Sequence, residues 1–116
     1  MKHPSISRLC ILTAASIAMI VWNPSLKAQD AASVQITLKD HKFSPAEPHA
    51  PAGKPIIITL KNLDPAPAEF ESNMLRVEKV VTGGSTITIR IRALEPGRYR
   101  FFDDFNPATQ GYLVVQ

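Results

Sequence analysis

The sequence is poor in cysteine and glycine. Its single cysteine, Cys10, lies near the N-terminus, so no disulfide can form within one chain. The 5 glycines are too few for a phosphate-cradling loop, and neither Cys-x-x-Cys nor His-Glu-x-x-His occurs. No serine has a histidine and an acid at a recognisable triad spacing. Hydrolysis and nucleotide chemistry therefore have little support, and an enzyme is the less favoured interpretation.

The N-terminus has the order of an export signal. Lys2 and Arg8 precede an apolar run over residues 9–22, and a polar stretch follows. The run has 14 residues, fewer than the roughly 20 that a membrane-spanning helix needs. We predict that residues 1–28 are a cleaved signal peptide. The mature domain, residues 29–116, would then lie in the periplasm without a membrane anchor.

Cleavage would remove the excess of positive charge. The chain has 13 Lys plus Arg and 10 Asp plus Glu; Lys2, Arg8 and Lys27 leave with the signal, so 13 − 3 = 10 balances 10. A nucleic-acid partner would need a basic patch, which a balanced chain does not favour. The remaining 116 − 28 = 88 residues suffice for one core, so we predict a single domain.

The mature sequence has the pattern of short strands. Apolar side chains alternate with polar ones at Val34, Ile36 and Leu38, and again over residues 85–92. Pro- and Gly-containing turns separate these runs, which indicates seven to eight strands in a β-sandwich or barrel. Gly83-Gly84 predicts a tight hairpin between its flanking strands. Residues 103–110 are predicted to be irregular.

Several short pieces together resemble the cupredoxin family, and more narrowly its EfeO-type branch. They are Phe43-Ser44-Pro45, Pro51-Ala52-Gly53, Asn62-Leu63-Asp64, Glu95-Pro96-Gly97-Arg98-Tyr99 and Gly111-Tyr112-Leu113-Val114-Val115. Their order and spacing cover nearly the whole mature chain. The resemblance implies a cupredoxin-like Greek-key β-sandwich, an all-β fold that agrees with the strand pattern.

Blue-copper members of that family bind copper with two His, a Cys and usually a Met. Carried over by spacing, these positions fall at Glu69, Asp103, near Asn106 and near Thr109, and none keeps the ligand. The predicted mature chain has no cysteine to supply a thiolate. The sequence therefore predicts that there is no type 1 copper centre.

Acidic residues stand at and beside two of those positions. Glu69 and Glu71 are two apart in a predicted strand, so their side chains share one face. In the family, the loop that holds Asp103 and Asp104 closes on the first-ligand loop. Carboxylate oxygens suit iron or manganese better than cuprous copper, so these four residues are the predicted metal ligands. The alternative is that they are solvated acidic residues in a loop.

Two further residues are weaker candidates. His41 follows the first predicted strand and could offer an imidazole, and Met74 could offer a thioether. An unremarkable surface histidine and a packing methionine are the alternatives.

The resemblance implies a function in iron handling. EfeO-type proteins are periplasmic accessory proteins that receive or oxidise iron for an inner-membrane permease of a ferrous-iron uptake system. The permease or other uptake components would be the partners, and iron, with copper less favoured, the cofactor or cargo. Two alternatives stay open: a ferroxidase component with a second metal or partner as electron acceptor, and a metal-free module that binds another envelope protein.

Overall fold

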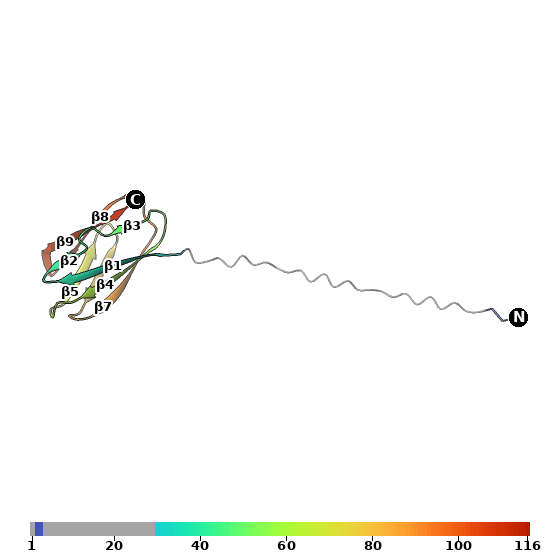
Figure 1. Cartoon of the computed structure of the whole chain (residues 1–116), viewed down its shortest axis with the longest axis horizontal. Coiled ribbons are helices and arrows are strands. Elements are labelled where there is room, and N and C mark those ends of the chain that lie inside the picture. Colours follow the sequence, from blue (N-terminus) through green and yellow to red (C-terminus); the bar gives the residue numbers. More distant parts are fainter. Residues whose placement is uncertain (1, 4–29) are drawn as a thin grey trace.

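The computed structural model describes residues 2–3 and 30–116, so nearly all of the predicted signal peptide lies outside the described residues. Within the described part, no helix is long and apolar enough to cross a membrane. The domain is built of nine strands (Figure 1): β1 (Ala32–Lys39), β2 (Lys42–Ser44), β3 (His49–Ala50), β4 (Ile56–Asn62), β5 (Ala68–Ser72), β6 (Val77–Val81), β7 (Thr86–Ile91), β8 (Gly97–Asp103) and β9 (Asn106–Val115).

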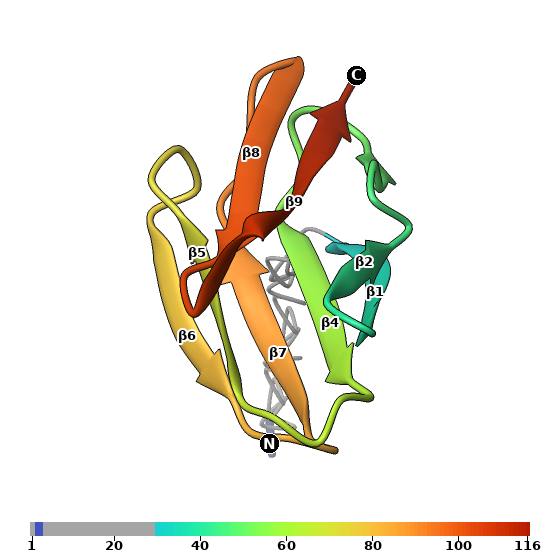
Figure 2. The ribbon, with the colours of Figure 1, turned by 90° about the vertical axis from the view of Figure 1, so that its left-hand side faces the viewer.

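The strands form two sheets, in the orders β2-β1-β4-β7 and β3-β9-β8-β5-β6. The β1–β4 and β3–β9 pairs are parallel, and the other pairs are antiparallel. Figure 2 shows β5, β6 and β8 beside one another in the second sheet. The all-β sandwich prediction is confirmed. β2 and β3, at 3 and 2 residues, are too short to give an alternating signal, which explains the lower expected count.

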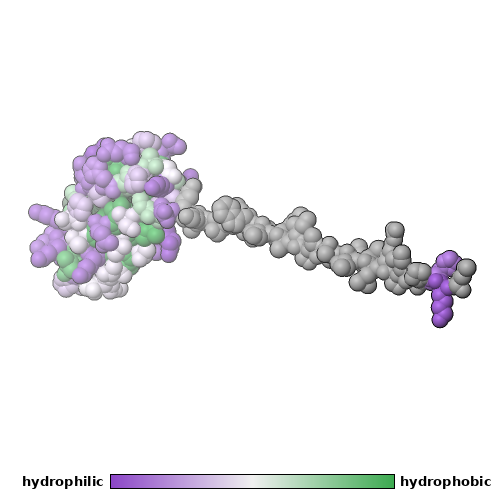
Figure 3. Space-filling view, turned by 45° about the vertical axis from the view of Figure 1, so that its right-hand side comes forward, coloured by the Kyte–Doolittle hydropathy of each residue, from purple (hydrophilic) through white to green (hydrophobic). Residues whose placement is uncertain are grey.

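The core lies between the sheets and uses the predicted alternation. Val34, Ile36 and Leu38 of β1 are all buried. The Phe101 ring lies 5.0 Å from those of both Phe43 and Phe70, measured between centroids, so one aromatic cluster joins the two sheets. On the face shown in Figure 3, hydrophilic and hydrophobic residues are interspersed.

The Asn62-Leu63-Asp64 segment ties the ends of several strands together. The buried Asn62 side chain donates to the carbonyl oxygen of Ala66 and accepts from the Asp64 amide. Asp64 in turn accepts the amides of Asp40 and His41, at 2.7 and 3.0 Å. Those two residues have φ values of 50° and 58°, a left-handed turn that the carboxylate stabilises. This segment therefore has a structural role: its hydrogen bonds hold the loop that leads into β5.

The predicted hairpin at Gly83-Gly84 is wrong. β6 pairs with β5 in one sheet and β7 pairs with β4 in the other, so the two glycines carry the chain from one layer to the next. A Cβ at Gly83 would collide with the carbonyl oxygen of Pro65. Gly84 has a φ of 71°, which favours glycine. The sequence identified the turn, but a local pattern does not specify which partner each strand chooses.

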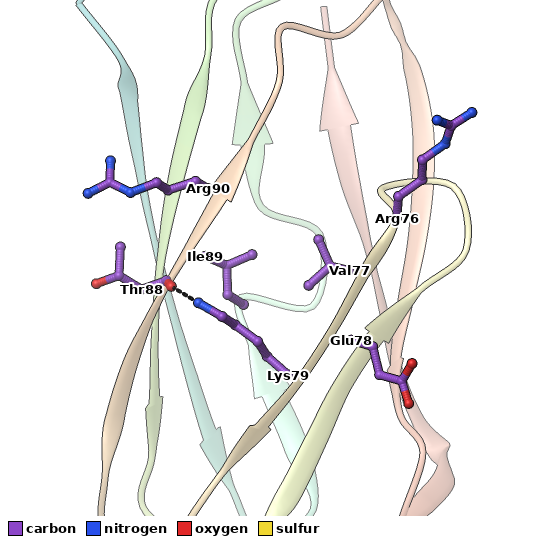
Figure 4. A pocket seen from close by; sticks show the side chains of 7 residues that line it. All are labelled: Arg76, Val77, Glu78, Lys79, Thr88, Ile89 and Arg90. Carbon is purple, nitrogen blue, oxygen red and sulfur yellow. Dashed lines mark hydrogen bonds between the residues drawn. The ribbon is translucent and has the colours of Figure 1, made fainter.

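β6 and β7 are edge strands of different sheets and border an open hollow of about 300 Å³. Lys79 of β6 is in register with the core residue Phe70, so it points inward instead of to the outer face. Its Nζ crosses the seam and donates to the carbonyl oxygen of Thr88 in β7 at 2.8 Å (Figure 4).

The segment before the last strand is more regular than expected. β9 begins at Asn106 and runs to Val115, so only Asp104 and Phe105 separate it from β8. The prediction of an irregular stretch over residues 103–110 is therefore wrong. The tight turn places Asp104 against β5, where the Asp104 amide donates to the carbonyl oxygen of Glu69 at 2.9 Å.

Candidate metal site

The site lies on the outer face of the five-stranded sheet. Core-facing Phe70 separates Glu69 from Glu71 in β5, and the alternation of a strand turns both carboxylates away from the core. Asp104 approaches them from the β8–β9 turn. One side-chain oxygen from each of these three residues lies within 4.8 Å of the other two. The sequence prediction that β5 and this turn bring carboxylates together agrees with this geometry.

Glu69 is the most enclosed member of the cluster. Its exposed fraction is 9%, although it points away from the core. Its Oε1 atom is buried and has no hydrogen-bond partner. An unsatisfied buried carboxylate oxygen is costly, and a cation within reach would satisfy it.

Asp103 lies in a different environment from Glu69, Glu71 and Asp104, the other three predicted ligands. Its side chain is 1% exposed and faces the core side of β8, in register with Phe70. The Oδ1 atom accepts the amides of Glu69 and Phe105, at 2.9 and 3.0 Å, and Oδ2 accepts the Asn106 side chain at 3.4 Å. Asp103 therefore holds the β5 backbone and the β8–β9 turn in place, and it does not belong to the outward-facing group.

A fourth carboxylate, Glu78 of β6, was missed by the sequence reasoning. It is the direct cross-strand partner of Glu71. Residues that face each other across an antiparallel pair share one side of the sheet, so Glu78 projects to the same face. The register of the β5–β6 hairpin could have identified it. Ala68 pairs with Val81 and Ser72 with Val77, which places Glu78 opposite Glu71.

The pKa values of two carboxylates in the cluster, Glu69 and Glu71, are raised. The pKa of Glu69 rises from its usual 4.5 to about 7, chiefly through a side-chain hydrogen bond with Glu78, and further through burial and the charges of its acidic neighbours. The pKa of Glu71 is also raised, first by burial and then by the charges of Asp104 and Glu78. In residues 30–116 the one ion pair joins Arg98 to Glu47, so no basic side chain pairs with the cluster.

The weaker sequence candidates lie elsewhere. His41 belongs to the turn after β1, where its carbonyl oxygen accepts the hydroxyl of Thr109. Met74 is in the β5–β6 turn, 50% exposed, and its carbonyl oxygen accepts from Arg92. Neither is a member of the carboxylate group.

The surroundings of the cluster include exposed apolar side chains. Val80 of β6 faces Glu69 across the strand pair and is 52% exposed. Phe105, which follows Asp104 in the turn, is 48% exposed. The chemical character of the site is thus a group of hard oxygen donors with an apolar border.

Comparison with known proteins gives a consistent fold assignment. Residues 11–115 match the model of the Cupredoxin-like domain family. An uncharacterized protein of Rickettsia prowazekii (strain Madrid E), RP394, is 34% identical over 118 residues, which are 98% of this chain and 94% of that protein.

Solved structures at lower identity are similar in fold alone. The metal binding domain of the Streptococcus pneumoniae D39 Cu(I) exporting P-type ATPase CopA, with Cu(I), has a TM-score of 0.66 at 20% identity, over 72% of this chain and 84% of that one. Auracyanin A, a "blue" copper protein from Chloroflexus aurantiacus, has a TM-score of 0.61 at 16% identity, over 74% and 99% of the two chains.

Proposed function

This chain belongs to the cupredoxin-like domain family, and from that premise we propose that it is a periplasmic metal-binding accessory protein whose ligands include Glu69, Glu71 and Asp104. The observation that carries the proposal is the buried, unpartnered Oε1 of Glu69 inside a group of acidic side chains. Burial and like charge both disfavour three ionised carboxylates at this distance. A bound cation would offset both the cost of burying the carboxylates and the repulsion between them.

The blue-copper ligand set of the family does not fit this chain. Glu69 and Asp103 are neighbours, joined by a 2.9 Å hydrogen bond from the Glu69 amide, so the carried-over positions do meet. Their side chains are carboxylates, however, and residues 30–116 contain no cysteine. A thiolate centre therefore cannot form from them, and these residues do not supply the ligands of a copper electron-transfer site.

Iron is the metal that we propose for the site. All-carboxylate donors are hard ligands, and their negative charge matches Fe(III) better than Fe(II). The EfeO-type resemblance supports a role in delivering iron to an inner-membrane permease of a ferrous-iron uptake system. The signal-peptide pattern of residues 1–28 supports the periplasmic location. Binding alone meets this role, whereas ferroxidase action would need a separate electron acceptor.

A second candidate function is an interaction module without metal. Val80 and Phe105, which are about half exposed and border the cluster, favour it because exposed apolar side chains mark contact surfaces. In that case the acidic residues would serve partner recognition.

Metal titration of the mature domain tests the proposal. We expect one cation per chain in calorimetry with Mn(II) and in equilibrium dialysis against Fe(III) citrate. Glu69→Gln should weaken both by about tenfold or more, because it removes one ligand charge. Glu95→Gln, the same change at an exposed residue outside the group, should have no effect. A folded domain that binds neither metal would leave the interaction module as the better explanation.

A further inference from the structure

From the register of β5 and β6 we infer that Glu78 is a fourth ligand of this site, and that it makes the site select trivalent over divalent cations. The inference rests on the proposed function, since it adds one residue and a charge preference to the same cluster.

The strand pairing places Glu78 beside the group of Glu69, Glu71 and Asp104, although it is not one of the three whose oxygens lie within 4.8 Å of one another. Glu71 and Glu78 are directly opposite in an antiparallel pair, where Cβ atoms are roughly 5 Å apart and side chains share one face. Like charges at such positions destabilise a sheet. A cation between the two carboxylates converts this cost into a favourable interaction.

The orientation of Glu78 supports the same conclusion. Figure 4 shows its carboxylate pointing away from the Lys79 side chain, although Glu78 is also one of the residues that line the hollow between β6 and β7. The raised pKa of Glu69, of which Glu78 is the first cause, agrees with this placement. Glu69 is 9% exposed and keeps one buried oxygen without a partner, which indicates a ligand independently of the charges.

The number of carboxylates sets the charge preference. Three ionised ligands balance a trivalent cation. With a fourth, a trivalent ion compensates three of the four negative charges, and a divalent ion compensates only two. Coulomb attraction scales with the product of the charges, so each carboxylate attracts a trivalent ion one and a half times as strongly as a divalent ion. Glu78 therefore adds more affinity for the trivalent ion, whatever the softness of the metal.

Calcium and terbium test the preference for trivalent ions because Ca(II) and Tb(III) have similar radii and both prefer oxygen ligands. We would titrate the mature domain, Glu78→Gln, Glu78→Asp and the control Glu95→Gln with each ion at constant pH and ionic strength. If Glu78→Gln weakens Ca(II) binding by about tenfold, the three-to-two charge ratio predicts about a thirtyfold loss for Tb(III). Glu78→Asp should retain most of the selectivity, and circular dichroism would verify that each variant is folded.

The outcomes separate this inference from the proposed function. Binding by the wild-type domain, with a larger loss for Tb(III) than for Ca(II) in Glu78→Gln only, supports both. Binding that Glu78→Gln leaves unchanged, or weakens equally for the two ions, overturns the role of Glu78 but not the metal site. A wild-type domain that binds Fe(III) but neither Ca(II) nor Tb(III) overturns this inference alone, and a domain that binds no metal overturns the proposed function with it.

Discussion

Asp103 and Glu69 are linked by one hydrogen bond, yet neutralising them should change stability in opposite directions. Asp103 is 1% exposed and accepts the amides of Glu69 and Phe105. Asp103→Ala leaves both donors unsatisfied, at about 1 to 3 kcal/mol for the buried one and about 1 kcal/mol for the other. We therefore expect a loss of about 2 to 4 kcal/mol in the free energy of unfolding. Asp103→Asn keeps an acceptor and should cost less, but should still destabilise.

Glu69→Gln should instead stabilise the metal-free domain. It removes one charge from a site where the side-chain hydrogen bond with Glu78, then burial and the charges of the acidic neighbours, raise the pKa of Glu69 to about 7. Thermal unfolding by circular dichroism at pH 7.5 with a chelator would measure both variants. For a domain of this size about 4 to 8 °C accompany each kcal/mol, so Asp103→Ala should lower Tm by roughly 10 °C or more. An unchanged Tm for Asp103→Ala, or stabilisation by Asp103→Asn, would refute the positioning role of Asp103.

Three other outcomes are expected. Because the pKa of Glu69 is raised from 4.5 to about 7 on folding, protonation of Glu69 favours the folded state. The contribution of Glu69 to the stability of the metal-free domain should be complete below pH 4.5 and lost as pH rises through 7, so the loss over that range should be smaller in Glu69→Gln. A slope identical in the two proteins, by thermal melts over that range, would contradict the assignment. Copper(II) added to the mature domain should give no intense thiolate charge-transfer band in the visible spectrum, because residues 30–116 contain no cysteine; a blue solution would be inconsistent with this. Expressed in a Gram-negative host, the protein should appear in the osmotic-shock fraction with an N-terminus near Gln29, and intact mass of a full-length, membrane-retained chain would overturn the export prediction.

Local patterns in the sequence were sufficient for the class of fold. The alternation at Val34, Ile36 and Leu38 predicted which side chains of β1 would be buried. The same kind of pattern could not distinguish a hairpin from a crossover at Gly83-Gly84, since both need glycine-rich turns. The sheet to which a strand belongs depends on long-range pairing, and the sequence of one strand does not identify its partner.

The candidate site was only partly predictable for a related reason. Spacing two apart was enough to place Glu69 and Glu71 on one face. Glu78 required the register of the β5–β6 hairpin, and the burial of Asp103 required knowing that β8 continues to that residue before a tight turn. A loop in place of that turn would have left Asp103 free to face the cluster, which is what the family resemblance implied.

The bridge from Lys79 to Thr88 has a consequence for the behaviour of the protein among its own copies. β6 and β7 each leave one edge unpaired, and exposed edges are templates on which other chains can add strands and aggregate. An inward-pointing lysine at this seam obstructs such growth, because an incoming strand would have to break its hydrogen bond and desolvate its charge. The fold thereby disfavours self-association at the seam between β6 and β7, while the outer face with the carboxylates stays accessible.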